Sequence, residues 1–271
     1  MARKKFLVIV VILGLALAII SFIGGAVGAV ITGKAPLGIF DVSTPHVELA
    51  AGKPFPRLPI TNTMIAGWIT ILVLFGLFFV ATRKMKLIPT GLQNFVEFLC
   101  EIGADFITGI VGEENGRRFF PLVVTIFLFV AVNAWIGLIP GFESIKLNGT
   151  PLLRNANTDI NVPLMLASVS VVAIEYWGFK AKGVSYLGTF FGLTGPIEAI
   201  SHLVRIISFT FRLFGNMTAG VVLSSVMIFI VPLVVPSLFY GLEAFFGFVQ
   251  ALIFAGLTLV FGYAAVMLAE E

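Results

Sequence analysis

Long apolar runs alternate with short charged clusters along most of the chain. Because a helix needs about 20 apolar residues to cross the hydrocarbon core of a bilayer, these runs predict membrane-spanning helices. Four of them cover residues 6–31, 64–81, 119–138 and 163–177. The first could also be a cleaved signal peptide, since small residues lie near its end, but its length favours a retained helix.

The last two apolar runs, residues 196–231 and 237–268, are of a different kind. Each is longer than the about 20 residues that a perpendicular span requires, so these helices must tilt or extend beyond the bilayer. A short turn around Val235 and Pro236 joins them. The pattern therefore predicts a long, inclined helical hairpin.

Residues 89–112 follow a helical period with one acidic side. Glu97, Glu101 and Asp105 recur every four positions, with aromatic and aliphatic residues between them. An amphipathic helix of this kind lies at the membrane surface. Residues 32–63, with five prolines, read as an extended surface loop. We therefore predict an all-α, polytopic integral membrane protein with about five to six transmembrane helices, one surface amphipathic helix and a long tilted C-terminal hairpin.

Composition supports this class. Of the 271 residues, 59% are hydrophobic and 11% are charged, whereas a soluble domain carries about 25% charged residues. The scarcity of charge excludes a water-soluble fold, and together with the 28 phenylalanines it excludes disorder. One cysteine and two distant histidines provide neither a disulfide framework nor the ligands of a zinc or haem site.

Basic residues gather at the ends of the apolar runs, which is the pattern of the positive-inside rule and not of a nucleic-acid-binding patch. With the amino terminus inside, ten Lys and Arg residues lie on the cytoplasmic side and five on the other. The carboxyl terminus is then cytoplasmic. The first set is Arg3, Lys4, Lys5, Arg83, Lys84, Lys86, Arg117, Arg118, Lys180 and Lys182, and the second is Lys34, Lys53, Arg57, Lys146 and Arg154.

Few ionisable side chains lie within the spans, where each costs about 2.5–3.5 kcal/mol on insertion scales. Five polar residues of the run 196–231 are spaced by 4, 3, 7 and 4 positions and so share one helical face. A stripe of this kind could simply bind two helices to each other, but a fixed cation at mid-membrane favours an ionic role. The five residues are Glu198, His202, Arg205, Arg212 and Asn216.

Acidic residues approach Arg212 from both sides of the membrane. Glu198 lies fourteen residues earlier, about 21 Å nearer the cytoplasm along a helix. Glu243, which shares a helical face with Gln250, enters from the outer side. Because arginine stays protonated, Arg212 cannot relay a proton, yet it attracts a carboxylate. This arrangement predicts two offset half-channels served by a mobile carboxylate carrier.

Glu175 is the other acid within a span. It lies near the cytoplasmic end of the run 163–177, where we expect an end-of-helix acid that pairs with Lys180 or Lys182.

Two other function classes fit the sequence less well. A secondary transporter would show repeat-related halves with broken helices, and the two long runs have no counterpart in the first half of the chain. An intramembrane enzyme would need a Ser/His/Asp, di-aspartate or metal-ligand set within the spans, and the sequence offers none there.

Residues 208–220, with the sequence SFTFRLFGNMTAG, resemble the signature of subunit a, the stator channel of rotary ATP synthases. The sequences GPIE at 195–198 and QALIF at 250–254 support the resemblance, as do Asn133 with GLIP at 137–140 and TDIN at 158–161. The resemblance covers about residues 60–271. It implies a proton-translocating channel subunit of the Fo sector, with no catalytic site of its own and no cofactor. The choice between H⁺ and Na⁺ rests with the surroundings of the ring carboxylate.

What the resemblance implies for single residues is specific. Arg212 would be the essential arginine that faces the c-ring carboxylates, and Glu198 would lie in the cytoplasmic half-channel. The outer half-channel would be lined by Asn216, Glu243 and Gln250. The candidates for the outer mouth are Asp159 and Asn161, and those for a further pathway position are Arg205, His202 and Glu175. We expect His202 to be in packing or water contact, because no family role is attached to it.

One departure from the family concerns Val221. Many bacterial relatives carry an acid at this position, directly after the Ala-Gly of the signature. Mitochondrial-type relatives carry an acid seven residues before the glutamine, as Glu243 stands here. The channel acid is therefore expected on the second helix of the hairpin.

The resemblance also implies partners and a location. The partners are the c-ring, peripheral-stalk subunit b and membrane lipids, with no nucleic acid, and the location is a bacterial plasma (inner) membrane. We divide the chain into an N-terminal apolar helix or signal segment (1–40), an external loop (41–63) and a channel domain (64–271) that contains the hairpin 196–268.

Overall fold

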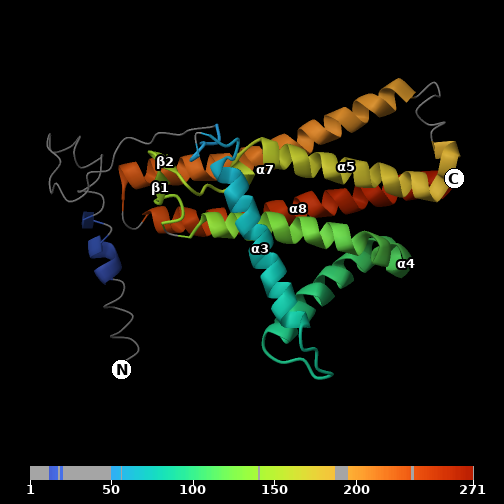
Figure 1. Cartoon of the computed structure of the whole chain (residues 1–271), viewed down its shortest axis with the longest axis horizontal. Helices are drawn as coiled ribbons and strands as arrows, with labels where there is room; N and C mark the ends of the chain where they lie inside the picture. The colour runs from blue at the N-terminus through green and yellow to red at the C-terminus, as the bar shows by residue number, and fades with distance from the viewer. Residues whose placement is uncertain are drawn as a thin grey trace. The chain divides into compact units, whose positions relative to one another are not determined.

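The computed structural model describes residues 12–17, 19–20, 50–55, 57–139, 141–186, 195–232 and 235–270. Within these ranges, five helices are long and apolar enough to cross a membrane (Figure 1). The predicted all-α membrane class is therefore confirmed. Of the predicted first span, only residues 12–17 and 19–20 are described, and they are helical. The choice between a retained helix and a signal peptide lies outside the described residues.

The long helices match the predicted spans, and two of them match the predicted hairpin. Short elements lie between them, including an antiparallel pair of strands in which Lys146 is opposite Pro151. The long helices are α3 (Asn62–Thr82), α4 (Leu92–Gly137), α5 (Asn161–Lys182), α7 (Gly195–Ile230) and α8 (Val235–Glu270). The short elements are β1 (Lys146–Leu147), β2 (Thr150–Pro151) and the 3₁₀ helices η1 (Ala156–Thr158) and η2 (Gly183–Tyr186).

Helix α4 joins two predicted elements, the amphipathic helix and the span that follows it. Its helical path is interrupted at Gly112, where φ is 78° and ψ is 169°. Only glycine adopts this backbone region readily, because it has no Cβ. The two arms of α4 diverge from this bend (Figure 1). The boundary between the two elements is confirmed, but they are joined at a single residue without a loop.

The chain divides into two units, Met1–Leu49 with Met217–Phe246, and Ala50–Asn216 with Gly247–Glu271. Within the second unit, aromatic contacts hold α4, α5 and the end of α8 side by side (Figure 1). Phe119 of α4 packs edge-on against Trp177 of α5, with ring centroids 4.4 Å apart. Phe127 of α4 packs on Phe248 of α8 at 5.6 Å. Phe119 and Trp177 belong to the buried core of that unit, whereas Phe248 is partly exposed.

A buried polar cluster fastens one end of this unit, where α3, α4 and η1 meet. Thr70 of α3 donates a hydrogen bond to the Asn133 side chain of α4 at 3.3 Å. Asn133 in turn donates to Asn157 of η1 at 3.1 Å, and Asn157 donates to the carbonyl oxygen of Val130 at 3.1 Å. Hydrogen bonding offsets the cost of burying these amides.

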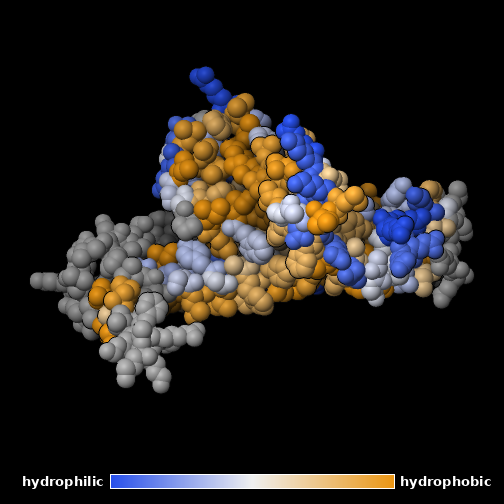
Figure 2. All heavy atoms as spheres, turned by 90° about the horizontal axis from the view of Figure 1, so that it is seen from below, coloured by the Kyte–Doolittle hydropathy of each residue, from blue (hydrophilic) through white to orange (hydrophobic). Residues whose placement is uncertain are grey.

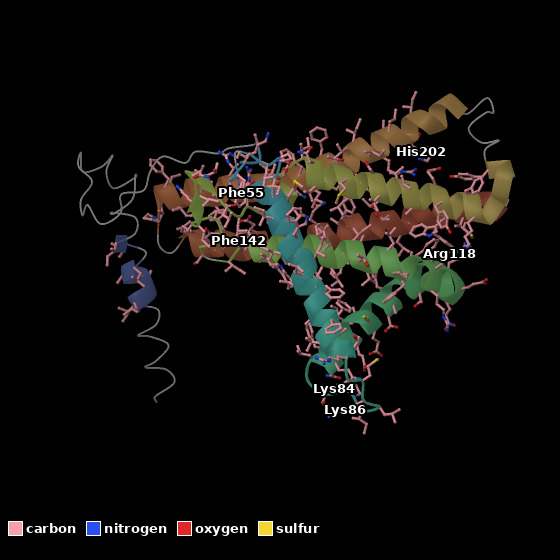
Figure 3. The ribbon with its side chains drawn as sticks, in the orientation of Figure 1. Phe55, Lys84, Lys86, Arg118, Phe142 and His202 are labelled. Atoms are coloured by element: carbon pink, nitrogen blue, oxygen red, sulfur yellow. The ribbon has the colours of Figure 1, made fainter. Side chains whose placement is uncertain are left out.

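The outer surface of the helices is strongly apolar. Leu72 and Phe75 of α3 are 68% and 67% exposed, and hydrophobic side chains cover much of the face drawn in Figure 2, with hydrophilic patches between them. Contiguous exposed apolar surface of this kind suits contact with lipid. Lys84 and Lys86 lie beyond the C-terminal end of α3, and Phe55 and Phe142 lie towards its opposite end (Figure 3).

Candidate functional site

Helix α7 has a buried side, an exposed apolar side and a polar stripe between them. Phe209 and Leu213 are buried, whereas Ile207 and Phe211 are more than half exposed. Arg212 is exposed and lies between these two sides. The amphipathic pattern therefore places the guanidinium at the edge of an apolar surface.

Arg212 lines an open groove of about 360 Å³. Arg205 lies in the same groove, with its guanidinium carbon 4.2 Å from the centre of the Phe261 ring of α8, a cation–π contact. Arg212 makes no hydrogen bond or ion pair with any side chain that the structure describes. The remaining lining residues are Ile200, Ser201, Val204, Ser208, Phe209 and Leu257.

Asn216 and Gln250 meet between α7 and α8. The Asn216 amide Nδ2 donates a hydrogen bond to Gln250 Oε1. Gln250 is only 1% exposed, and its Nε2 has no hydrogen-bond partner among the described residues. A buried donor without a partner is costly, so this amide offers a hydrogen bond to a water molecule or an ion.

In the unit that contains residues 217–246 of α7 and α8, Glu243 of α8 packs against α7. Its side chain is 9% exposed, and Oε2 accepts a hydrogen bond from Ser224 Oγ at 3.0 Å. A Cβ placed on Gly220 would lie 3.2 Å from both Cγ and Cδ of Glu243. The missing side chain at Gly220 therefore makes room for the carboxylate.

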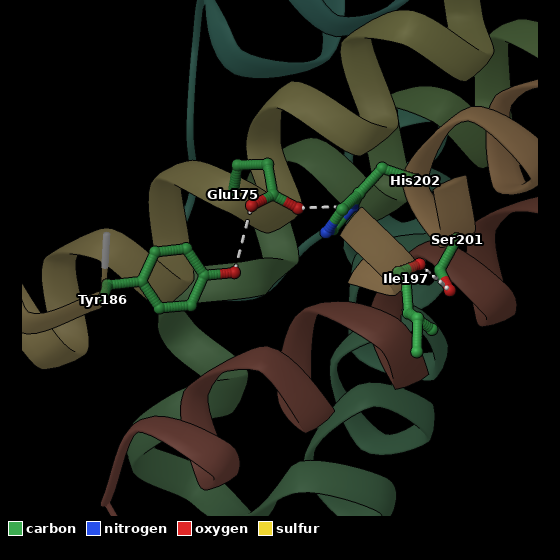
Figure 4. Close-up of polar contacts among 5 residues, drawn as sticks. All are labelled: Glu175, Tyr186, Ile197, Ser201 and His202. Atoms are coloured by element: carbon green, nitrogen blue, oxygen red, sulfur yellow. Dashed lines mark hydrogen bonds and ion pairs between the residues drawn. The ribbon is translucent and has the colours of Figure 1, made fainter. Parts of the chain in front are cut away.

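Glu175 and His202 form an ion pair between α5 and α7. Glu175 Oε1 lies 2.8 Å from His202 Nδ1, and Tyr186 donates a hydrogen bond from its hydroxyl to Oε2 at 3.0 Å (Figure 4). The expected pairing of Glu175 with Lys180 is wrong, because the carboxylate faces α7. The side chain of Lys182 is not among those that the structure describes. His202 was expected in packing or water contact and instead holds this acid.

Asp159 and Asn161 lie where η1 leads into α5. Asp159 is 5% exposed, and Oδ2 accepts a hydrogen bond from Thr63 of α3 at 2.7 Å. Its Oδ1 accepts from the backbone N–H of Asn161 at 3.2 Å and from the Asn161 amide at 2.9 Å. Together these bonds hold the start of α5 against α3.

A sequence profile described as "ATP synthase A chain" matches residues 64–262. The chain belongs to this family. It is also 34% identical over 201 residues to ATP synthase subunit a of Gloeobacter violaceus (strain ATCC 29082 / PCC 7421), an alignment that covers 73% of this chain and 80% of the relative. Family membership confirms the resemblance. With its five membrane-length helices, this member of the ATP synthase A chain family is an integral membrane protein of the Fo sector, placed in ion transport and ATP synthesis.

In this member of the ATP synthase A chain family, the structure brings together some of the predicted residues and leaves others apart. Asn216 meets Gln250, and Glu175 meets His202, whereas Glu243 takes its hydrogen bond from a residue that was not predicted. Glu198 lies on α7, but its side chain is outside the description, so the assignment of this acid stays a prediction.

Three residues that bind predicted site residues were not predicted from the sequence, namely Ser224, Tyr186 and Thr63. A signal for Ser224 was present, because Asn216, Gly220 and Ser224 are spaced by four and continue the polar stripe of α7. Tyr186 and Thr63 lie in other elements than the acids they bind, so no helical spacing could have connected them.

Proposed function

We propose that this chain conducts protons through two offset half-channels, and that the protons load and leave carboxylates on a c-ring that rotates past Arg212. The observation that carries the proposal is the exposure of Arg212. This guanidinium stands at the edge of an apolar face of α7 and has no polar partner among the described side chains.

A permanent cation in the membrane needs a counter-charge. Since the described residues supply none to Arg212, we assign that role to a carboxylate outside the chain, which the c-ring presents. Because arginine does not release its proton, Arg212 also keeps protons from passing directly between the two half-channels. A ring carboxylate must therefore pick up its proton on one side and carry it around.

We assign Asn216, Gln250 and Glu243 to the outer half-channel and Glu198 to the cytoplasmic one. Two features support the outer path: Nε2 of buried Gln250 has no hydrogen-bond partner within the described part of the chain, and the carboxylate of Glu243 is enclosed. Asp159 and Asn161 would lie near its mouth. During ATP synthesis, the cost of exposing an ionised carboxylate to lipid makes the neutral, loaded form travel through the membrane.

The proposal also covers the partners of the chain, its orientation and its membrane. Subunit b of the peripheral stalk and membrane lipids are the further partners, the C-terminus is cytoplasmic, and the membrane is a bacterial plasma membrane. Residues 64–271 act as the channel domain, and the chemistry of ATP takes place on other subunits.

The test replaces the guanidinium and leaves the rest of the complex in place. In membrane vesicles containing the assembled complex, we expect Arg212→Ala to abolish ATP synthesis driven by an imposed proton gradient. Arg83→Ala is the matched control, because Arg83 is an exposed cation at the end of α3. Recovery of the variant chain together with the c-ring verifies assembly. Near-normal synthesis by Arg212→Ala would refute the proposal.

A further inference from the structure

Three elements contribute one polar side chain each to a cluster near the start of α7. His202 of α7, Glu175 of α5 and Tyr186 of η2 are joined by contacts of 2.8 Å and 3.0 Å (Figure 4). The side chains of His202 and Glu175 are 13% and 28% exposed. The proposed function gives none of the three a role.

Chemistry distinguishes this cluster from an ordinary contact between helices. Two helices can be joined by neutral hydroxyl or amide groups, as Thr258 of α8 and Ser170 of α5 are at 3.1 Å. A largely buried acid and base cost more, because both must be removed from water. Histidine is also the side chain whose charge ordinarily changes between about pH 5 and 8. The cluster therefore has the means to hold and release a proton.

The contacts of Glu175 bear on the route that a proton would take. Both carboxylate oxygens of Glu175 are engaged, one by His202 and the other by Tyr186. Since Nδ1 is directed at Glu175, a proton exchanged with other groups would pass through Nε2. The charge that His202 gains is balanced by Glu175, and Tyr186 holds the carboxylate in place.

The position along α7 matches the cytoplasmic half-channel. His202 is one turn from Glu198 on the polar stripe, and about 15 Å along the helix before Arg212. Among the described side chains, the charged and titratable groups near it are Glu175 from α5, Tyr186 from η2 and Arg205 from the next turn of α7. Helix α8 packs on α7 through Phe261 and carries Tyr263 two residues further on.

We propose that the His202–Glu175 pair is a proton-exchange station of the cytoplasmic half-channel and that Tyr186 is its positioning residue. This inference rests on the proposed function. During synthesis, Nε2 of neutral His202 takes up a proton that has left a ring carboxyl group, and the imidazolium passes it to water on the cytoplasmic side. During ATP-driven pumping the same steps run in reverse.

The experiment uses inverted membrane vesicles with the complete complex, in which the cytoplasmic side faces the medium. ATP-driven proton pumping is followed by dye quenching while the medium is varied between about pH 6 and 8, within the range in which histidine ordinarily changes charge. We expect His202→Gln to flatten the dependence of the pumping rate on pH. Glu175→Gln should also flatten it, because the charge that His202 gains is then no longer balanced, and Tyr186→Phe should have a smaller effect in the same sense.

Ser168→Ala is the matched control. Ser168 lies seven residues before Glu175 on α5 and donates its hydroxyl to the carbonyl oxygen of Leu164 on the same helix at 2.8 Å, as Ser201 does to Ile197 on α7 (Figure 4). This variant should keep the wild-type profile. His202→Ala adds a second readout, because imidazole in the medium should restore pumping in proportion to its free-base concentration.

If the His202–Glu175 pair only holds α5 and α7 together and exchanges no proton, the experiment gives different results. The His202 variants would then lose rate equally at every pH, and imidazole would restore nothing, which would overturn the inference. If the His202 variants do not assemble, the test is the dependence of pumping on pH in Glu175→Gln. An unchanged pH profile in that variant would overturn the inference. The proposed function is tested separately, because Arg212→Ala abolishes synthesis whether or not His202 exchanges protons.

Discussion

Glu243 occupies the space that a side chain at position 220 would fill. Because a Cβ on Gly220 would lie 3.2 Å from Cγ and Cδ of Glu243 and 3.3 Å from Oε1, Gly220→Ala should push the carboxylate away from Ser224. Loss of this position should slow the passage of protons through the outer half-channel in either direction. We expect ATP-driven proton pumping in vesicles to fall severalfold, while ATP hydrolysis by the detached F1 sector is unchanged.

Gly76→Ala is the control for this substitution. Gly76 lies on α3, and a Cβ there would meet no atom within 4 Å, so pumping should stay at the wild-type rate. If Gly220→Ala pumped as fast as Gly76→Ala, Glu243 would have no part in the path.

Helical spacing predicted which side chains share a face but not which side chains meet across helices. The polar stripe of α7 was evident from intervals of four, three and seven residues. Glu175, however, was assigned to a lysine on its own helix, because a single sequence shows only local neighbours. Its partner His202 comes from α7, and α5 had to pack against α7 before the two could meet.

The bend of α4 depends on a backbone conformation that only glycine adopts readily. Gly112 has φ of 78° and ψ of 169°, so Gly112→Ala would strain the bend by about 1–3 kcal/mol. We expect the detergent-purified complex with Gly112→Ala to unfold at a lower temperature than wild type. The fraction of this chain that stays folded is measured as the temperature is raised.

Gly109 provides the comparison for the α4 bend. It lies one turn earlier in a regular part of the helix, with no atom within 4 Å of an added Cβ. There alanine should be neutral or stabilise by about 0.5–1 kcal/mol. Equal effects of the two substitutions would show that the bend carries no strain.

The same bend shows what could be predicted at the level of elements. The change of period between residues 89–112 and 119–138 separated an amphipathic helix from a span, because periodicity reflects the environment of each face. It could not show that the two helices meet at one residue. The junction at one residue depends on the dihedral angles of Gly112, and the pattern of hydrophobic residues does not reveal these angles.

A hydrogen bond from Thr63 to Asp159 joins the start of α3 to the start of α5. Thr63→Val keeps the shape of the side chain but leaves Oδ2 of buried Asp159 without this donor. We expect the free energy of unfolding to fall by about 1.5–3 kcal/mol, the range for hydrogen bonds to charged groups. Thermal denaturation of the detergent-purified complex measures the change.

Thr82→Val is the control for this hydrogen bond. Thr82 is exposed, and its hydroxyl donates to the carbonyl oxygen of Phe78 on the same helix at 2.8 Å. Its loss should change stability little. A Thr63→Val protein as stable as Thr82→Val would show that Asp159 finds another partner or is not held by this bond.

The class of the whole molecule could be predicted because it depends on composition, which the lipid environment sets directly. A chain with 11% charged residues cannot cover itself with polar surface, and the helices accordingly expose residues such as Leu72 and Phe75. The buried amide cluster around Asn133 and Asn157 could not be predicted in this way, because its members come from helices far apart in the sequence.

The distribution of basic residues predicts how the whole chain lies across the membrane. Because ten Lys and Arg residues fall on one side and five on the other, the segment after α3 should face the cytoplasm and the β1–β2 hairpin the outside.

The test labels single cysteines from one side of the membrane. The chain's one cysteine is first removed with Cys100→Ser. Lys84→Cys or Lys146→Cys, both at exposed positions, is then added singly. In intact cells a membrane-impermeant maleimide should label the second variant and not the first, and in inverted vesicles the reverse. Labelling of both variants after permeabilisation shows that both thiols are accessible, and the opposite pattern in intact cells would mean that the chain lies the other way round.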